Sequence, residues 1–180
     1  MESAESSKLR NLFIDLGRSE EDDPYYDDVF KCGLPLDVKW EGHPLFMMLP
    51  GMWRYIEHLD SKTINAQNVF GDTLLHTLTC TYILPEGVSS VVAAGGDVNI
   101  VNYDGMTPLH GLLQSRFYQY HNKREIEIVA TFIRSGLDVT KTFEGETYAD
   151  MAMKSGRCEI WELLQLASHP DHVLTLSPTS

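Results

Sequence analysis

The sequence lacks the features that mark membrane-spanning, secreted or nucleic-acid-binding proteins. No apolar run approaches the roughly 18–20 residues that a membrane helix requires. The N-terminal stretch MESAESSKLRNLFIDLG has no basic start and no long apolar segment, so we expect no signal peptide. Only three cysteines occur among 180 residues, and they are widely spaced. This usage argues against a disulfide framework and favours the cytoplasm or the nucleus.

Basic residues are also scarce. The chain has 14 Lys and Arg against 26 Asp and Glu, which gives a formal net charge of −12. Because contact with nucleic acid needs clustered basic side chains, we expect no nucleic-acid partner. An acidic protein prefers partners with basic surfaces, and we expect a monomer that binds such a protein. The segment 19–28, SEEDDPYYDD, is either a solvated acidic loop, a docking strip or a phosphorylation site.

Catalytic and metal-binding patterns are absent as well. His169 and His172 with Cys158 do not complete a set of four zinc ligands at suitable spacing. Gly95-Gly96 lacks the rest of the phosphate-binding glycine fingerprint and its following lysine. We therefore expect neither an enzyme nor a bound cofactor or metal.

What the chain does contain is an internal repeat. The stretches INAQNVFGDTLLHTL, VNIVNYDGMTPLHGL and VTKTFEGETYADMA each place a threonine two residues after a glycine. Successive glycines are 34 and 40 residues apart. The positions that recur are Gly71, Gly105, Gly145, Thr73, Thr107, Thr147 and, in the first two copies, His76 and His110.

Each copy carries signals for the start and the end of helices. Thr107 followed by Pro108 is typical of a helix N-cap and first helical position. Leu109, Leu112 and Leu113 then fall on one helix face. Apolar runs such as SSVVAAGGDVN and VATFIRSGLDVT end in glycine, which is typical of helix C-termini. Each unit is thus predicted to be helix, turn, helix and extended link.

With a period near 33 and a Thr-Pro-Leu-His signature complete at 107–110, the chain resembles the ankyrin-repeat family. The resemblance implies an all-α solenoid of about four to five helix-turn-helix units with short β-hairpin links. We expect degenerate N-terminal capping repeats over 1–63, ankyrin repeats with a C-terminal cap over 64–166, and a flexible tail over 167–180.

The resemblance also implies roles for single residues. The histidines His76 and His110 would tie helix to hairpin by side-chain hydrogen bonds. Asn99 follows Asp97-Val98 in the hairpin and is either a structural turn residue or a site for an asparaginyl hydroxylase.

The repeat pattern breaks at 116–123, RFYQYHNK, which exceeds the expected spacing. Insertions in repeats often form functional loops, and this one carries Phe117, Tyr118 and Tyr120. These aromatic residues either contact a partner or extend the helix pair and fold back onto neighbouring helices.

Ankyrin repeats imply that the function is binding to another protein through hairpin tips and the concave helix face. Our candidate contact residues at the tips are Asn68, Val69, Phe70, Asn102, Tyr103, Asp104, Phe143 and Glu144. Phe70 and Tyr103 rank first because an aromatic side chain at an exposed tip has no role in the core. We expect a stand-alone adaptor or inhibitor; the alternatives are a substrate adaptor of a ubiquitin ligase and a viral or bacterial effector that masks a host signalling protein.

Overall fold

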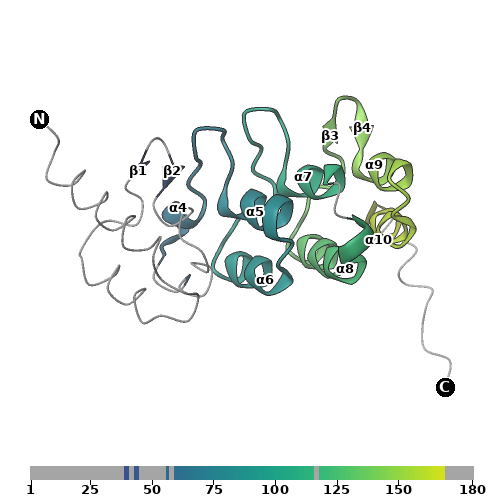
Figure 1. Cartoon of the computed structure of the whole chain (residues 1–180), viewed down its shortest axis with the longest axis horizontal. Coiled ribbons are helices and arrows are strands. Elements are labelled where there is room, and N and C mark those ends of the chain that lie inside the picture. Colours follow the sequence, from purple (N-terminus) through teal and green to yellow (C-terminus); the bar gives the residue numbers. More distant parts are fainter. Residues whose placement is uncertain (1–38, 41–42, 45–55, 57–58, 116–117, 169–180) are drawn as a thin grey trace, which may run out of the picture.

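The computed structural model describes residues 39–40, 43–44, 56, 59–115 and 118–168. Its helices lie in two rows with the hairpins on one side (Figure 1). The row nearer the hairpins contains α5 (Leu74–Thr77), which continues into the π-helical turn η2 (Leu78–Tyr82), then α7 (Pro108–Gln114) and α9 (Tyr148–Lys154). The second row contains α6 (Pro85–Ala93), α8 (Tyr118–Arg134) and α10 (Cys158–Ser168). The short α4 (Ser61–Ile64) precedes them.

The core runs between these two rows as one continuous apolar layer. Helices α5, α7 and α9 contact one another in turn, and α8 contacts both α6 and α10. Leu109 and Leu112 are fully buried, and Leu113 is 3% exposed, so the predicted face of α7 is the buried one. Because each helix pair buries its apolar side against its neighbours, the repeats form a stack with little freedom to move past one another.

The local signals for helix ends act as the sequence predicts. The hydroxyl of Thr107 accepts a hydrogen bond from the His110 N–H, and Pro108 takes the first helical position, where its missing N–H costs nothing. Gly95, Gly136 and Gly156 follow α6, α8 and α9 with φ between 74° and 98°, a region that residues with a Cβ rarely enter. The predicted solenoid of helix pairs with hairpin links is confirmed.

Two short β-hairpins have the same register. Strand β1 (Lys39–Trp40) pairs with β2 (His43–Pro44), and β3 (Thr142–Phe143) pairs with β4 (Glu146–Thr147). In the second of these, Glu144 and Gly145 connect the strands and both have positive φ, as a type I′ turn requires. The β1–β2 pairing lies within the predicted N-terminal repeats 1–63. The acidic segment 19–28 and most of the predicted tail 167–180 lie outside the described residues.

The described residues of the insertion form part of a helix and not a loop. Residues 118–123 form the start of α8, which runs without a break to Arg134, so the extra length lengthens a helix. Of the predicted contact residues here, Phe117 lies outside the described residues, as do the side chains of Tyr118 and Tyr120. Helix α10 also ends at Ser168, two residues beyond the predicted end of the repeats at 166.

Candidate protein-binding surface

Two neighbouring hairpins present a patch of apolar side chains to solvent. Tyr103 is 74% exposed, Phe70 61%, Val69 43% and Val101 42%. We call these four residues the tip patch. Aromatic residues contribute most when a partner buries them, and both of these side chains are more than half exposed. The predicted contact residues Phe70 and Tyr103 are thus placed together on one surface.

The backbone of the two hairpins is held in place beneath the patch. The Tyr103 N–H donates to the Phe70 carbonyl at 3.0 Å, and the Gln67 amide donates to the Val101 carbonyl at 2.9 Å. The Tyr103 ring lies against Gly71: a Cβ built there would fall 2.6 Å from the Tyr103 Cδ1. These contacts join one hairpin to the next, so the patch is largely formed before any partner arrives.

Asn68 and Asn102 lie inside these turns, and their contact with a partner stays a prediction. Each is only 8% exposed. The Asn102 Oδ1 accepts from the N–H groups of Asp104 and Met106 at 3.1 and 2.9 Å, and its Nδ2 donates to Asp72 at 2.8 Å. Asn68 accepts in the same way from Phe70 and Asp72. Both amides serve the turn itself.

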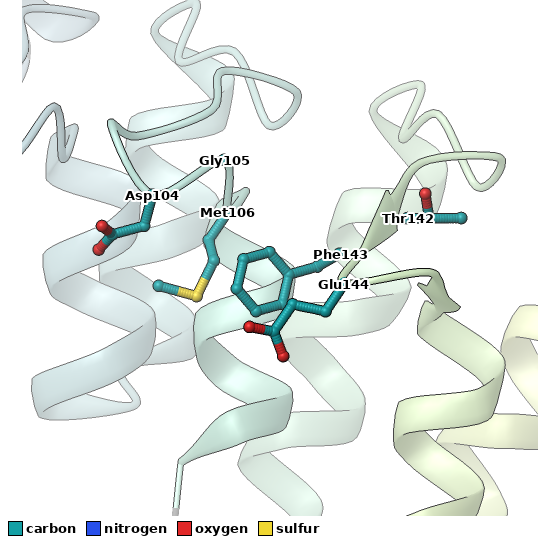
Figure 2. Close-up of a pocket in the computed structure, with 6 residues that line it drawn as sticks. All are labelled: Asp104, Gly105, Met106, Thr142, Phe143 and Glu144. Carbon is teal, nitrogen blue, oxygen red and sulfur yellow. The ribbon is translucent and has the colours of Figure 1, made fainter.

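A groove of about 590 Å³ opens beside the patch, between the loop 104–106 and the loop 142–144. Asp104, Gly105 and Met106 line one side, and Thr142, Phe143 and Glu144 line the other (Figure 2). Asp104 and Glu144 are exposed, whereas Met106 and Phe143 are half-buried. Among the predicted contact residues, Asp104 and Phe143 therefore share this groove.

The two histidines of the repeat signature differ in their contacts. The His76 Nδ1 accepts from the Thr73 N–H at 3.0 Å, and its Nε2 donates to the Met106 carbonyl of the next repeat at 3.0 Å. The His110 Nδ1 likewise accepts from the Thr107 N–H at 3.1 Å. Its Nε2, however, is buried and has no hydrogen-bond partner among the described residues. His110 thus ties its helix to Thr107 at the end of its own hairpin, and among the described residues it makes no hydrogen bond to the following one.

The following repeat explains this difference. It has Tyr148 where the signature has proline, and the Tyr148 hydroxyl is hydrogen-bonded to that of Thr107 at 2.8 Å. The Tyr148 ring lies 4.3 Å from the His110 ring, and the Phe143 ring lies 5.7 Å from it. These rings replace the polar contact with packing. Asp150 stands at the histidine position and completes a capping box with Thr147.

Burial sets the protonation of these side chains. Removal from water, and to a smaller extent the positive charge of Lys141, lowers the pKa of His110 to about 4. Burial also lowers the pKa of His76, although the hydrogen bond to Met106 opposes this. The Tyr148 hydroxyl has its pKa raised to about 12, chiefly by burial. Both histidines are therefore neutral structural groups at pH 7.

Asn99 joins one repeat to the next. Its Nδ2 donates to the Gly136 carbonyl at 3.0 Å, and its Oδ1 accepts from the Asp138 N–H at 2.8 Å. Asn65 makes the equivalent contacts one repeat earlier, with Gly95 and Asp97. The amide therefore does more than form a local turn, which is all that the sequence indicated. Hydroxylation of Asn99 stays a prediction.

Sequence reasoning missed a buried ion pair between Arg157 and Glu125, which lies at the C-terminal end of α7, away from the hairpins. Arg157 donates to both carboxylate oxygens of Glu125 at 3.2 Å, and to the carbonyls of Leu112, Leu113 and Ser115. Arg157 is 2% exposed and Glu125 is fully buried. Arg157 thereby satisfies free carbonyls at the C-terminal end of α7. Arg157 directly follows Gly156, which ends a helix, and nothing in the sequence at that position indicates a buried ion pair.

Among the described residues, no three His, Cys, Asp or Glu side chains are grouped so that they could hold a metal ion. None of the described helices is both long and apolar enough to cross a membrane.

The chain is similar to known ankyrin repeat proteins in sequence and in structure. No family model matches the chain. An ankyrin repeat protein of Rickettsia felis is 29% identical over 142 residues, which cover 77% of this chain and 58% of that protein. The crystal structure of an ankyrin repeat domain from Acinetobacter baumannii AYE superimposes with a TM-score of 0.68 at 19% identity, covering 90% of this chain and 93% of that one.

Proposed function

We propose that this chain, a member of the ankyrin-repeat family, binds another protein through the tip patch and the groove beside it. The observation that carries the proposal is the pairing of Phe70 and Tyr103. Two aromatic side chains more than half exposed stand on hairpins that are hydrogen-bonded to each other. Binding then orders few new groups, which keeps its entropic cost low.

The charge of the chain indicates what kind of surface it binds. With 26 acids against 14 bases, the protein attracts a basic partner and repels an acidic one. A scaffold that binds through a preformed surface suits an adaptor, or an inhibitor that masks its partner. We propose that it acts as a monomer in the cytoplasm or the nucleus.

The experiment compares capture of proteins by the wild type and by tip-patch variants. Tyr103→Ala is expected to weaken binding of the captured partner by about 1–3 kcal/mol, because an exposed aromatic anchor loses its contact area. Its melting temperature is expected to stay nearly unchanged. Leu166→Ala, a change at an exposed apolar residue of α10, is the matched control and is expected to keep the affinity of the wild type. Equal partner binding by the wild type and the Tyr103 variant would contradict the proposal.

A further inference from the structure

Hydrogen bonds join the two hairpins of the tip patch to each other, but among the described residues they do not join the second of these hairpins to the next one. The hairpins at 68–72 and 102–106 are joined by the Tyr103–Phe70 backbone bond and the Asn102–Asp72 side-chain bond. The next link is a residue shorter: seven residues separate Val139 from Thr147, and eight separate Val98 from Thr107. It forms the β3–β4 hairpin, and no backbone hydrogen bond joins 103–105 to 142–145 in the described structure. The groove opens at this break.

The floor of the groove is apolar and includes an aromatic ring. Met106 comes from one loop and Phe143 from the other (Figure 2). The Phe143 ring is backed by His110, which lies against Tyr148. Because His110 and Tyr148 are both buried, this stack has little room to move. It presents Phe143 to the groove from a fixed position.

The rim of the groove carries two carboxylates, Asp104 and Glu144. In the described part of the chain, neither side chain takes part in a salt bridge or accepts a hydrogen bond. Nearby acids differ: Glu146 is paired with Lys154, and Asp150 accepts from Thr147. The groove therefore combines two carboxylates that have no salt-bridge partner among the described residues with an aromatic floor.

We infer that this groove binds an arginine side chain presented by an extended, basic segment of the partner protein. The inference rests on the proposed function and names the chemistry of the partner. A guanidinium is planar, stacks on an aromatic ring and donates to carboxylates as a fork, so it suits the Phe143 ring and the Glu144 carboxylate, while Asp104 adds negative charge at the rim. Since Tyr103 directly precedes Asp104, an apolar residue beside that arginine reaches the tip patch.

The experiment selects random linear peptides displayed on phage against the folded, full-length protein. Selected peptides are expected to carry an arginine next to an apolar residue. Each is then measured by fluorescence anisotropy in its original form and with the arginine replaced by citrulline, which keeps the shape and removes the charge. The same peptides are measured against the double variant Asp104→Asn/Glu144→Gln and against Phe143→Leu.

The matched control is Glu127→Gln/Glu162→Gln, which removes the same charge from exposed positions of α8 and α10. Citrulline and the groove double variant are each expected to weaken binding about tenfold, whereas the control is expected to stay within about twofold. Selection of peptides without arginine, equal loss in both double variants, or no selected peptide at all would overturn the inference. Loss of partner capture in Tyr103→Ala with no effect of the groove variant would leave the proposed function standing and remove this inference alone.

Discussion

Glu125 and Arg157 lie 32 residues apart in the chain, and their side chains form a nearly fully buried ion pair at 3.2 Å. Glu125 lies in α8, just after the inserted residues, and Arg157 precedes α10. The guanidinium also donates to the Leu113 and Ser115 carbonyls at the end of α7. One side chain thus connects the helices of the last two repeats, next to the point where the insertion lengthens α8.

Replacing Arg157 with methionine is expected to destabilise the fold by about 3–5 kcal/mol, because it leaves the Glu125 carboxylate buried without a partner. Urea unfolding measures the change. Lys154→Met is the matched control: it breaks the exposed Lys154–Glu146 pair and is expected to cost less than about 1 kcal/mol. The double variant Glu125→Leu/Arg157→Met is expected to be more stable than Arg157→Met alone. Equal losses for Arg157→Met and Lys154→Met would show that burial does not strengthen this pair.

The helix boundaries could be predicted from the sequence because they depend on local chemistry. A threonine before a proline caps a helix in almost any setting, and a glycine after an apolar run ends one. Thr107, Pro108 and Gly136 follow these rules without help from the rest of the chain.

The contact surface was harder to predict, because an asparagine at a hairpin suits either a turn or a partner. Asn102 proved to be part of the turn, while the adjacent Tyr103 is exposed. The Glu125–Arg157 pair could not be predicted, since the two residues lie 32 positions apart and the insertion just before Glu125 breaks the repeat pattern that would have placed it. The groove depends on one missing residue in a link and on the packing of three rings, neither of which a repeat consensus encodes.

Asn99→Ala is expected to destabilise the fold by about 1–3 kcal/mol, because it removes two hydrogen bonds between neighbouring repeats. Asn65→Ala removes the equivalent pair and is expected to have a similar cost. Ser89→Ala, at an exposed position of α6, controls for a small polar-to-apolar change. Thermal unfolding followed by circular dichroism is the measurement. An Asn99 variant as stable as the Ser89 control would mean that the amide adds nothing between repeats.

Gly71 and Gly105 allow the contact between hairpins to be isolated. Both have positive φ, 77° and 84°, so alanine at either position is expected to cost about 1–2 kcal/mol in backbone strain. At Gly71 the new Cβ would also fall 2.6 Å from the Tyr103 backbone nitrogen, whereas at Gly105 it would meet nothing within 4 Å. Gly71→Ala is therefore expected to be the less stable variant in urea. If the two variants unfold at the same urea concentration, the tip of the second hairpin does not pack on the first.

The buried imidazole of His110 predicts how stability depends on pH. Its pKa is about 4 in the folded chain, against an ordinary value of 6.5 that applies when the chain unfolds. Between about pH 4 and pH 6.5, the His110 imidazole is therefore protonated in the unfolded state and neutral in the folded state. Stability from this group is complete above about pH 6.5 and is lost as the pH falls toward 4, by on the order of 1–2 kcal/mol. The carboxylates with lowered pKa, such as Asp138 and Asp150, act in a separate window below their ordinary value of 3.8.

His110→Gln isolates this contribution, because glutamine does not titrate and the remaining histidines are common to both proteins. Urea unfolding of the wild type and the variant at several pH values gives the difference in their free energies of unfolding. We expect this difference to be constant near neutral pH and to shrink steadily between about pH 6.5 and pH 4. Because the buried His110 Nε2 has no hydrogen-bond partner in the described part of the chain, the charged form gains no hydrogen bond there to offset its lost hydration. A difference that stays level down to pH 4 would mean that water reaches this ring, and that the Phe143–His110–Tyr148 stack does not hold the groove floor in place.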